Sequence, residues 1–129
     1  MMWNVYLKPR NIYIEGIKEI EVYTFETTQK FNGSILGIIN DFDSINVFEN
    51  ALSKSQTKVK FKDYIDDNDI VESYSLKVKA KNSQGGFLMF LFIGQNNEES
   101  YITFLGYEDI YHIPSEETGK LKEIFSKIN

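Results

Sequence analysis

The side chains best suited to bind a cation or a partner gather in one polar stretch that follows residue 62. Carboxylates and one phenol make up this group, at Asp63, Tyr64, Asp66, Asp67 and Asp69. A calcium-binding EF-hand loop needs glycine at its sixth position and glutamate at its twelfth, and counting from either Asp63 or Asp67 meets neither requirement. We therefore expect no metal here and interpret the five residues as an acidic binding surface.

Acid–base catalysis near neutral pH depends on one residue, because His112 is the only histidine. Its alternation with Tyr111 and Ile113 is typical of a strand end, and the sequence does not identify a carboxylate that would orient the ring. We assign no catalytic residue, and a hydrolase that uses His112 is the least favoured alternative. The absence of cysteine excludes thiol catalysis, disulfides and Cys-ligated zinc.

Composition indicates one globular domain spanning residues 1–129, because 42% of the 129 residues are hydrophobic. The formal net charge of −5 and the single arginine, Arg10, argue against binding to nucleic acid or to an anionic membrane. The longest apolar run, Phe87 to Ile93, is far shorter than the roughly 20 residues that cross a bilayer. We expect no cofactor and no membrane insertion. The location is cytoplasmic if Met1 is the native start and extracytoplasmic if a signal segment was removed.

Residues 70–104 predict the centre of the fold, a β-hairpin followed by a third strand. Between Ser73 and Ala80, apolar and polar side chains alternate, which is typical of a strand with one buried face. The run from Phe87 to Ile93 contains no polar residue, and this favours a central strand that is covered on both faces.

The flanking segments supply further strands and two helices. A long strand is expected within residues 12–28, a short buried strand at 34–39 that pairs with it, and a last strand at 107–113. A helix is expected after Asp43, its proposed N-cap, with an apolar stripe at three- and four-residue spacing. A second helix, with Ser115 as its cap, has a stripe of Leu121, Ile124, Phe125 and Ile128.

The order of these elements carries a resemblance to a known family. A helix, a polar loop, a Tyr-Ser-Leu-Lys-Val strand at 74–78, an apolar strand and a Leu-Lys-Glu-Ile ending at 121–124 resemble the YhfM-like domain of small Gram-positive lipoproteins. The resemblance covers residues 17–129. It implies an α+β fold and a non-catalytic role near the bacterial cell envelope.

We expect an α+β fold in which an antiparallel sheet of five or six strands carries two helices on one face. The expected function is that of a small non-enzymatic domain that binds a protein partner. An acidic, cysteine-free domain also suits an immunity-type inhibitor of a basic toxin, through electrostatic steering. We further expect that an edge strand at 107–113 can pair with its own copy to form a homodimer.

Overall fold

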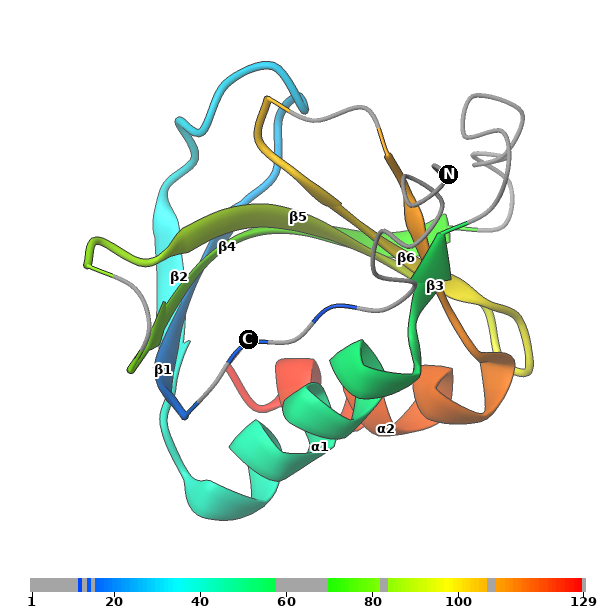
Figure 1. Cartoon of the computed structure of the whole chain (residues 1–129). Coiled ribbons are helices and arrows are strands. Elements are labelled where there is room, and N and C mark those ends of the chain that lie inside the picture. The colour runs from blue at the N-terminus through cyan, green and yellow to red at the C-terminus, as the bar shows by residue number, and fades with distance from the viewer. Residues whose placement is uncertain are drawn as a thin grey trace, which may run out of the picture.

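One curled antiparallel sheet wraps around two helices, which pack on one of its faces (Figure 1). The computed structural model describes residues 12, 14, 16–57, 70–81, 84–106 and 109–128. Its seven-stranded sheet has the order β2-β1-β4-β5-β6-β7-β3. In chain order the elements are β1 (Ile17–Thr24), β2 (Ile35–Ile39), α1 (Phe42–Lys54), β3 (Gln56–Thr57), β4 (Ile70–Ala80), β5 (Phe87–Gly94), β6 (Ser100–Phe104), β7 (Tyr111–Ile113) and α2 (Ser115–Ser126).

The predicted α+β class is confirmed, with both helices on one face. The sheet has seven strands rather than five or six, and the unexpected one is the two-residue strand β3. The first strand is confirmed over Ile17–Thr24 only. No helix among the described residues combines the length and apolarity that a membrane span requires.

The central hairpin forms as its patterns predict. In β4, Tyr74, Leu76, Val78 and Ala80 are all buried, and β5 pairs with β4 so that Leu76 lies opposite Met89. Strand β5 is buried along most of its length, because its alternate side chains enter two different hydrophobic clusters. Met89, Leu91 and Ile93 belong to the cluster on the helix side.

The other face of β5 has an aromatic cover of its own. Phe90 and Phe92 form a second cluster with Tyr101, and Phe25 and Phe31 pack against it. The Phe25 ring lies edge-on to Phe90 and Phe92, with centroid distances of 5.7 Å and 5.2 Å. Because both phenylalanines come from residues 25–34, the segment between β1 and β2 covers this part of the sheet.

The same face is polar where β1 and β4 pair. Lys79 Nζ lies 2.9 Å from Glu21 and 3.3 Å from Glu19, which places one cation between two carboxylates. The hydrogen bond from Lys79 and a second one from Tyr23 lower the pKa of Glu21. These ion pairs join the adjacent strands β1 and β4.

Both helices begin differently from expectation. The N-cap of α1 is Asp41, whose Oδ2 accepts a hydrogen bond of 3.0 Å from Ser44 N, so Asp43 lies inside the first turn. Helix α2 starts at Ser115 with Pro114 as its N-cap and has no side-chain cap. The proposed caps were wrong because each chosen residue already has helical backbone geometry, whereas an N-cap does not.

Aromatic rings hold the helices to the sheet and to each other. Phe125 of α2 stacks on Tyr74 of β4 at a centroid distance of 5.1 Å, and it lies 6.5 Å from Phe48 of α1. The predicted stripes of both helices enter this core, since Phe48, Leu52, Leu121 and Phe125 are nearly inaccessible to solvent.

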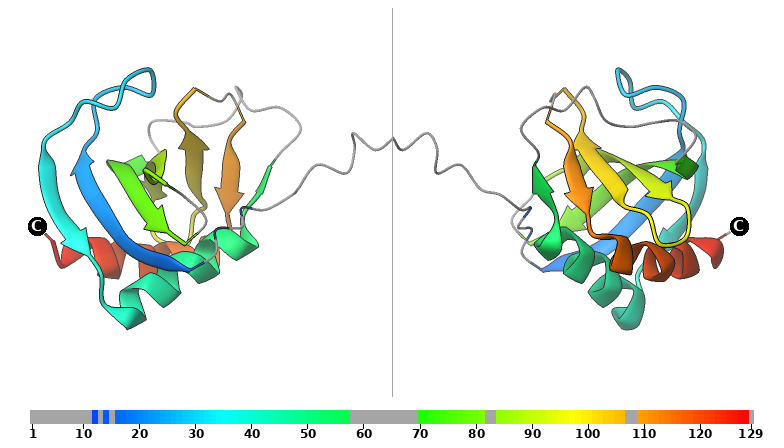
Figure 2. Two further views of the ribbon diagram at one scale, coloured as in Figure 1. Left: turned by 60° about the vertical axis from the view of Figure 1, so that its left-hand side comes forward. Right: turned by 90° about the vertical axis from the view of Figure 1, so that its right-hand side faces the viewer.

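The edges of the sheet are β2 and β3, at its opposite ends (Figure 2). The segment expected to be an edge, 107–113, contributes β7, which is covered because Gln56 and Thr57 of β3 pair with His112 and Tyr111. Strand β2 was expected to be buried, yet Ile35, Leu36 and Ile38 are exposed. Within the described residues, only β1 pairs with this strand.

Two glycine substitutions test this packing with opposite signs. A Cβ atom at Gly33 would lie 1.9 Å from the carbonyl oxygen of Thr24, whereas a Cβ at Gly119 in α2 would meet nothing within 4 Å. We expect Gly33→Ala to lower the free energy of unfolding by about 2 kcal/mol or more. Gly119→Ala should raise it by about 0.5–1 kcal/mol. Urea denaturation followed by circular dichroism measures both, and equal effects would contradict the packing of residues 25–34.

Candidate functional site

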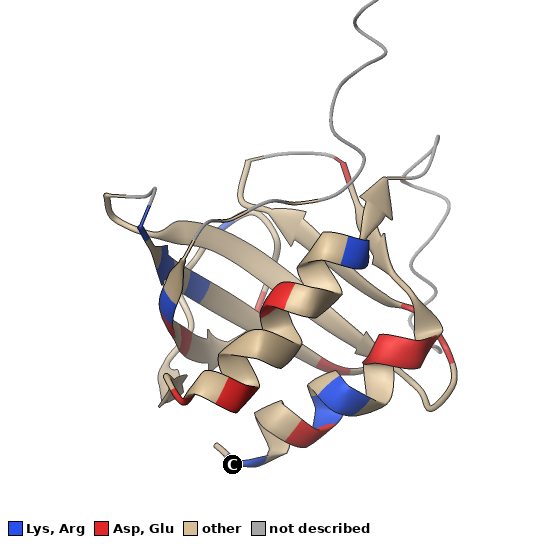
Figure 3. Cartoon of the chain, turned by 60° about the horizontal axis from the view of Figure 1, so that its bottom comes forward, with Lys and Arg blue, Asp and Glu red and all other residues tan. Residues whose placement is uncertain are grey.

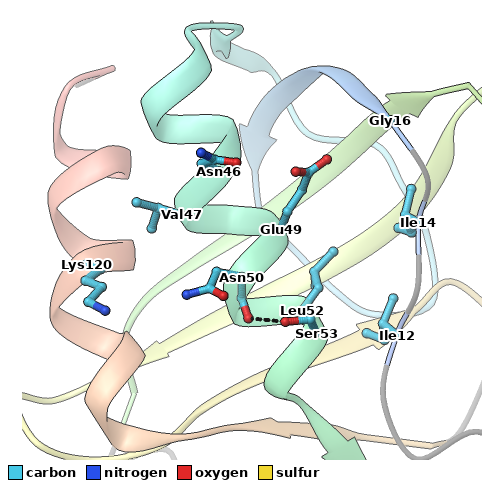
Figure 4. Close-up of a pocket in the computed structure, with 10 residues that line it drawn as sticks. All are labelled: Ile12, Ile14, Gly16, Asn46, Val47, Glu49, Asn50, Leu52, Ser53 and Lys120. Atoms are coloured by element: carbon cyan, nitrogen blue, oxygen red, sulfur yellow. Dashed lines mark hydrogen bonds between the residues drawn. The ribbon is translucent and has the colours of Figure 1, made fainter.

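A groove of about 760 Å³ runs along the outer side of α1 (Figure 4). One wall comes from the segment that leads into β1, the floor comes from α1, and α2 contributes a cation on the opposite side. The lining residues are Ile12, Ile14, Gly16, Asn46, Val47, Glu49, Asn50, Leu52, Ser53 and Lys120. The groove therefore combines apolar walls with a small set of polar groups, which is the usual composition of a small-molecule site.

Glu49 is the only carboxylate among the described residues that line the groove. Its Oε2 accepts a hydrogen bond of 3.2 Å from the backbone N–H of Ile17, the first residue of β1. This contact joins α1 to the start of the sheet and fixes the orientation of the carboxylate. Figure 4 shows the Glu49 side chain directed toward the segment that carries Ile14 and Gly16. A carboxylate held at one oxygen is positioned to accept a proton at the other.

The helical repeat places three amide and hydroxyl side chains near Glu49. Asn46, Asn50 and Ser53 follow one another at spacings of four and three, so they share one face of α1. Ser53 Oγ donates a 2.8 Å hydrogen bond to the carbonyl of Asn50. Figure 4 shows Asn50 directed toward the side on which Lys120 reaches in from α2. Amide N–H groups and an ammonium group can stabilise a developing oxyanion.

A buried carboxylate links the helices beside the groove. Glu117 in the first turn of α2 is inaccessible to solvent, and its Oε2 accepts a 3.0 Å hydrogen bond from Lys54 Nζ at the end of α1. Its Oε1 lies 3.8 Å from Lys120 Nζ. Figure 3 shows the basic end of α1 close to the acidic start of α2. Glu117 therefore joins the end of α1 to the start of α2 through Lys54.

His112 lies elsewhere and does have a carboxylate beside it. Its Nδ1 is 3.0 Å from Glu99 Oε1, and its ring packs edge-on against Tyr101 at a centroid distance of 4.8 Å. The imidazole is buried, and it lines neither the groove nor the second pocket described below. The structure thus supplies the carboxylate partner that the sequence could not identify.

A second pocket of about 420 Å³ lies where β5, β6 and β7 meet at one end of the sheet. Its walls are mostly apolar and include Phe87, Phe104 and Tyr111, with Asp109 as the only carboxylate among its described residues. The part of its lining that the structure describes contains neither a lysine nor an amide side chain. The groove along α1 is therefore the better equipped of the two for polar chemistry.

The residues that the sequence singled out for binding, Asp63, Tyr64, Asp66, Asp67 and Asp69, lie outside the described residues. Sequence reasoning missed Glu49, Asn46 and Asn50, because polar residues at three- and four-residue spacing are typical of any solvated helix face. Only the placement of Ile12, Ile14 and α2 around α1 turns this face into a groove. Within the part of the chain that is described, no three His, Asp or Glu side chains form a metal-binding cluster.

Comparison with known proteins adds a family and a structural relative. A protein-family model matches residues 12–125. The crystal structure of a thioesterase-like protein from Clostridium sporogenes is similar, with a TM-score of 0.72 and 25% sequence identity. The match covers 88% of this chain and 98% of the other. No curated protein matches the sequence.

These findings contradict the expectation of a non-enzymatic binding domain. That expectation rested on the absence of cysteine and of recognisable catalytic motifs, and on a single histidine. A carboxylate beside amide groups in a groove needs none of these to activate water, so their absence does not exclude hydrolysis.

The asymmetry of the Glu117 contacts yields a stability prediction. Lys54→Met would leave a buried carboxylate without its 3.0 Å partner, whereas Lys120→Met would remove only a 3.8 Å contact. Loss of one partner from a buried charge pair is costly because the other charge stays desolvated. We expect Lys54→Met to lower the free energy of unfolding more than Lys120→Met does, as measured by urea denaturation at neutral pH.

The same pair predicts a dependence on alkaline pH. The hydrogen bond to Glu117 raises the pKa of Lys54 above its usual 10.5. Its contribution to stability is therefore complete below about pH 10.5 and is lost as the pH rises through the higher pKa of the folded state. We expect the wild type to lose more stability than Lys54→Met over that range in thermal unfolding. Parallel pH profiles for the two proteins would contradict the ion pair.

Proposed function

Since the chain belongs to the family whose model matches residues 12–125, and its fold is similar to that of a thioesterase-like protein, we propose that it is a hydrolase that cleaves thioester bonds. The groove along α1 is the proposed site. The observation that carries the proposal is the position of Glu49, fixed by the 3.2 Å hydrogen bond from Ile17 between the apolar wall and the amide side chains.

Glu49 acts as the general base in this proposal. A water molecule attacks the thioester carbonyl carbon while Glu49 accepts one of its protons, and the carbonyl oxygen becomes an oxyanion. The C–S bond then breaks, the oxyanion returns to a carbonyl, and the departing sulfur takes the proton back from Glu49. The products are a carboxylic acid and a thiol, and the carboxylate of Glu49 is regenerated. No oxidant or further reactant is needed.

The other lining residues have separate roles. Asn46 precedes Glu49 by three residues on the same face of α1, and its amide N–H group stabilises the oxyanion. The apolar side chains hold the acyl group through burial. These are Ile12, Ile14, Val47 and Leu52. The volume of about 760 Å³ suits a small-molecule substrate.

An alternative for the same reaction uses His112 as the general base in place of Glu49. The 3.0 Å contact between its Nδ1 and Glu99 favours this alternative, because a carboxylate that orients a histidine is a general feature of histidine bases. It is the weaker candidate, since His112 is buried and lines neither of the two pockets. Substitution of Glu49 and of His112, each on its own, distinguishes the two candidate bases.

Glu49→Gln tests the proposed base. Glutamine keeps an oxygen that can accept the hydrogen bond from Ile17, but it cannot take a proton from water at neutral pH. With acyl thioesters of increasing chain length as substrates, we expect kcat/KM to fall about 10²- to 10⁴-fold, measured by release of free thiol. Glu123→Gln, an exposed residue of α2 that does not line the groove, is the matched control and should be fully active.

The activities of His112→Gln and of the wild type test the location of the site and the type of reaction. His112→Gln should retain activity if Glu49 is the base, whereas loss of activity in His112→Gln alone would move the site to the Glu99 pair. A wild-type protein that hydrolyses none of the thioesters, although its circular dichroism shows it folded, would refute thioester hydrolysis.

A further inference from the structure

The side of the groove that faces α2 has polar groups of its own. Figure 4 shows Lys120 of α2 and Asn50 of α1 on this side. Glu49 and the apolar wall, which contains Ile12 and Ile14, lie on the other side of α1. The general base of the proposed reaction belongs to the Glu49 side. The hydrolysis step therefore assigns no role to Lys120 or Asn50.

The positive charge of Lys120 is only partly compensated within the part of the chain that the structure describes. Its one ion pair there is with Glu117, whose Oε1 lies 3.8 Å from Lys120 Nζ, too far for a hydrogen bond. The other oxygen of Glu117 accepts the 3.0 Å hydrogen bond from Lys54. One carboxylate is thus shared by two lysines, and Lys54 has the closer contact.

The ammonium group of Lys120 is accessible to a ligand. The Lys120 side chain is 54% exposed, whereas that of Glu117 is 1% exposed. Asn50 is exposed as well, and its side-chain amide adds N–H donors on the same side of the groove. A cation beside amide donors can bind an anion through charge-assisted hydrogen bonds.

We propose that Lys120 and Asn50 bind an anionic group of the substrate, so that Lys120 determines which thioesters are hydrolysed. This inference rests on the proposed hydrolysis at Glu49. The negative charge of Glu49 repels the anionic group and Lys120 attracts it, so the two charges orient the substrate across α1. The apolar remainder of the substrate then lies against Ile12 and Ile14.

The width of the helix limits the distance between the thioester and the anionic group. Glu49 and Lys120 lie on opposite sides of α1. An α-helix with its side chains is about 10–12 Å across, so the anionic group must lie within about that distance of the thioester carbonyl. A carboxylate on a short spacer meets this requirement, whether it belongs to the acyl part or to the thiol part. A phosphate at the far end of an extended carrier arm lies beyond it.

Two matched pairs of thioesters test the inference through release of free thiol. In one pair the acyl part ends in a carboxylate or in its methyl ester, and in the other pair the thiol part does. We expect the wild type to prefer the anionic member of one pair by about three- to tenfold in kcat/KM. The preference should come from a lower KM, because Lys120 lies away from the reacting carbon. The pair that shows it identifies the part of the substrate that carries the anion.

Lys120→Gln and Lys122→Gln distinguish a local effect from an effect of net charge. Each removes one positive charge from α2, but Lys122 is not among the described lining residues, and it donates a 2.9 Å hydrogen bond to Asn96. Lys120→Gln should abolish the preference by raising KM for the anionic thioester alone, with kcat unchanged. Lys122→Gln should retain the preference, and Lys120→Glu should reverse it. A general loss of stability would instead affect both members of a pair equally.

Three outcomes would overturn the inference. They are a wild type that hydrolyses anionic and neutral thioesters equally, equal effects of Lys120→Gln and Lys122→Gln, and a dependence on Lys120 only for thioesters of a long phosphorylated carrier. The first of these leaves thioester hydrolysis itself intact.

An uncleavable analogue separates this inference from the proposed function. The thioether that lacks the carbonyl oxygen of the preferred substrate cannot be hydrolysed, and calorimetry measures its binding. If the wild type cleaves no thioester, weaker binding of both thioethers with a carboxylate to Lys120→Gln than to Lys122→Gln supports the anion site, although the proposed function fails. Equal binding to the two variants refutes the anion site.

Discussion

Strand β5 imposes the main constraint on this fold, because its side chains are apolar on both faces and both must be covered. The helices cover one face through Leu121, Phe125 and their neighbours. Phe25 and Phe31 cover part of the other face from the segment between β1 and β2. This second cover restricts which strands can lie beside each other, since the segment must leave β1, pass over the aromatic cluster and return along the outer side of β1 as β2. Strand β2 consequently ends the sheet with an open edge.

The helix-side cover creates the groove. Two helices that share one face of a curled sheet must lie side by side, and Phe48 and Phe125 set their contact within the core. On the outside, the buried Glu117 joins the end of α1 to the start of α2 through Lys54. The hydrogen bond from Ile17 to Glu49 ties the other flank of α1 to β1. The hydrogen bond that fastens α1 to β1 therefore also positions the carboxylate of the proposed site.

The sequence predicted the fold class, the hairpin of β4 and β5 and both helices, because burial periodicity is a local property of each segment. It did not predict β3, which depends on which strands become neighbours, or the exposure of β2, which depends on what covers the faces of the sheet. The helix starts were missed by one or two residues, because Asp41 and Asp43 are equally good caps in sequence and the backbone decides between them. For the site, the sequence drew attention to rare residue types, and His112 is one. Glu49 and its amide neighbours are common on helix surfaces, so their pattern alone did not mark a site.

The placement of ionisable groups shows why a buried charge is not by itself evidence for catalysis. Glu117 is the most buried carboxylate described, but Lys54 holds its Oε2 and the fold covers it. His112 has a carboxylate partner but is packed against Tyr101. Glu49 is less buried than Glu117, and it lines the groove, where a substrate and water can reach it. Hydrolysis requires both, so access favours Glu49 over the more deeply buried groups as the base.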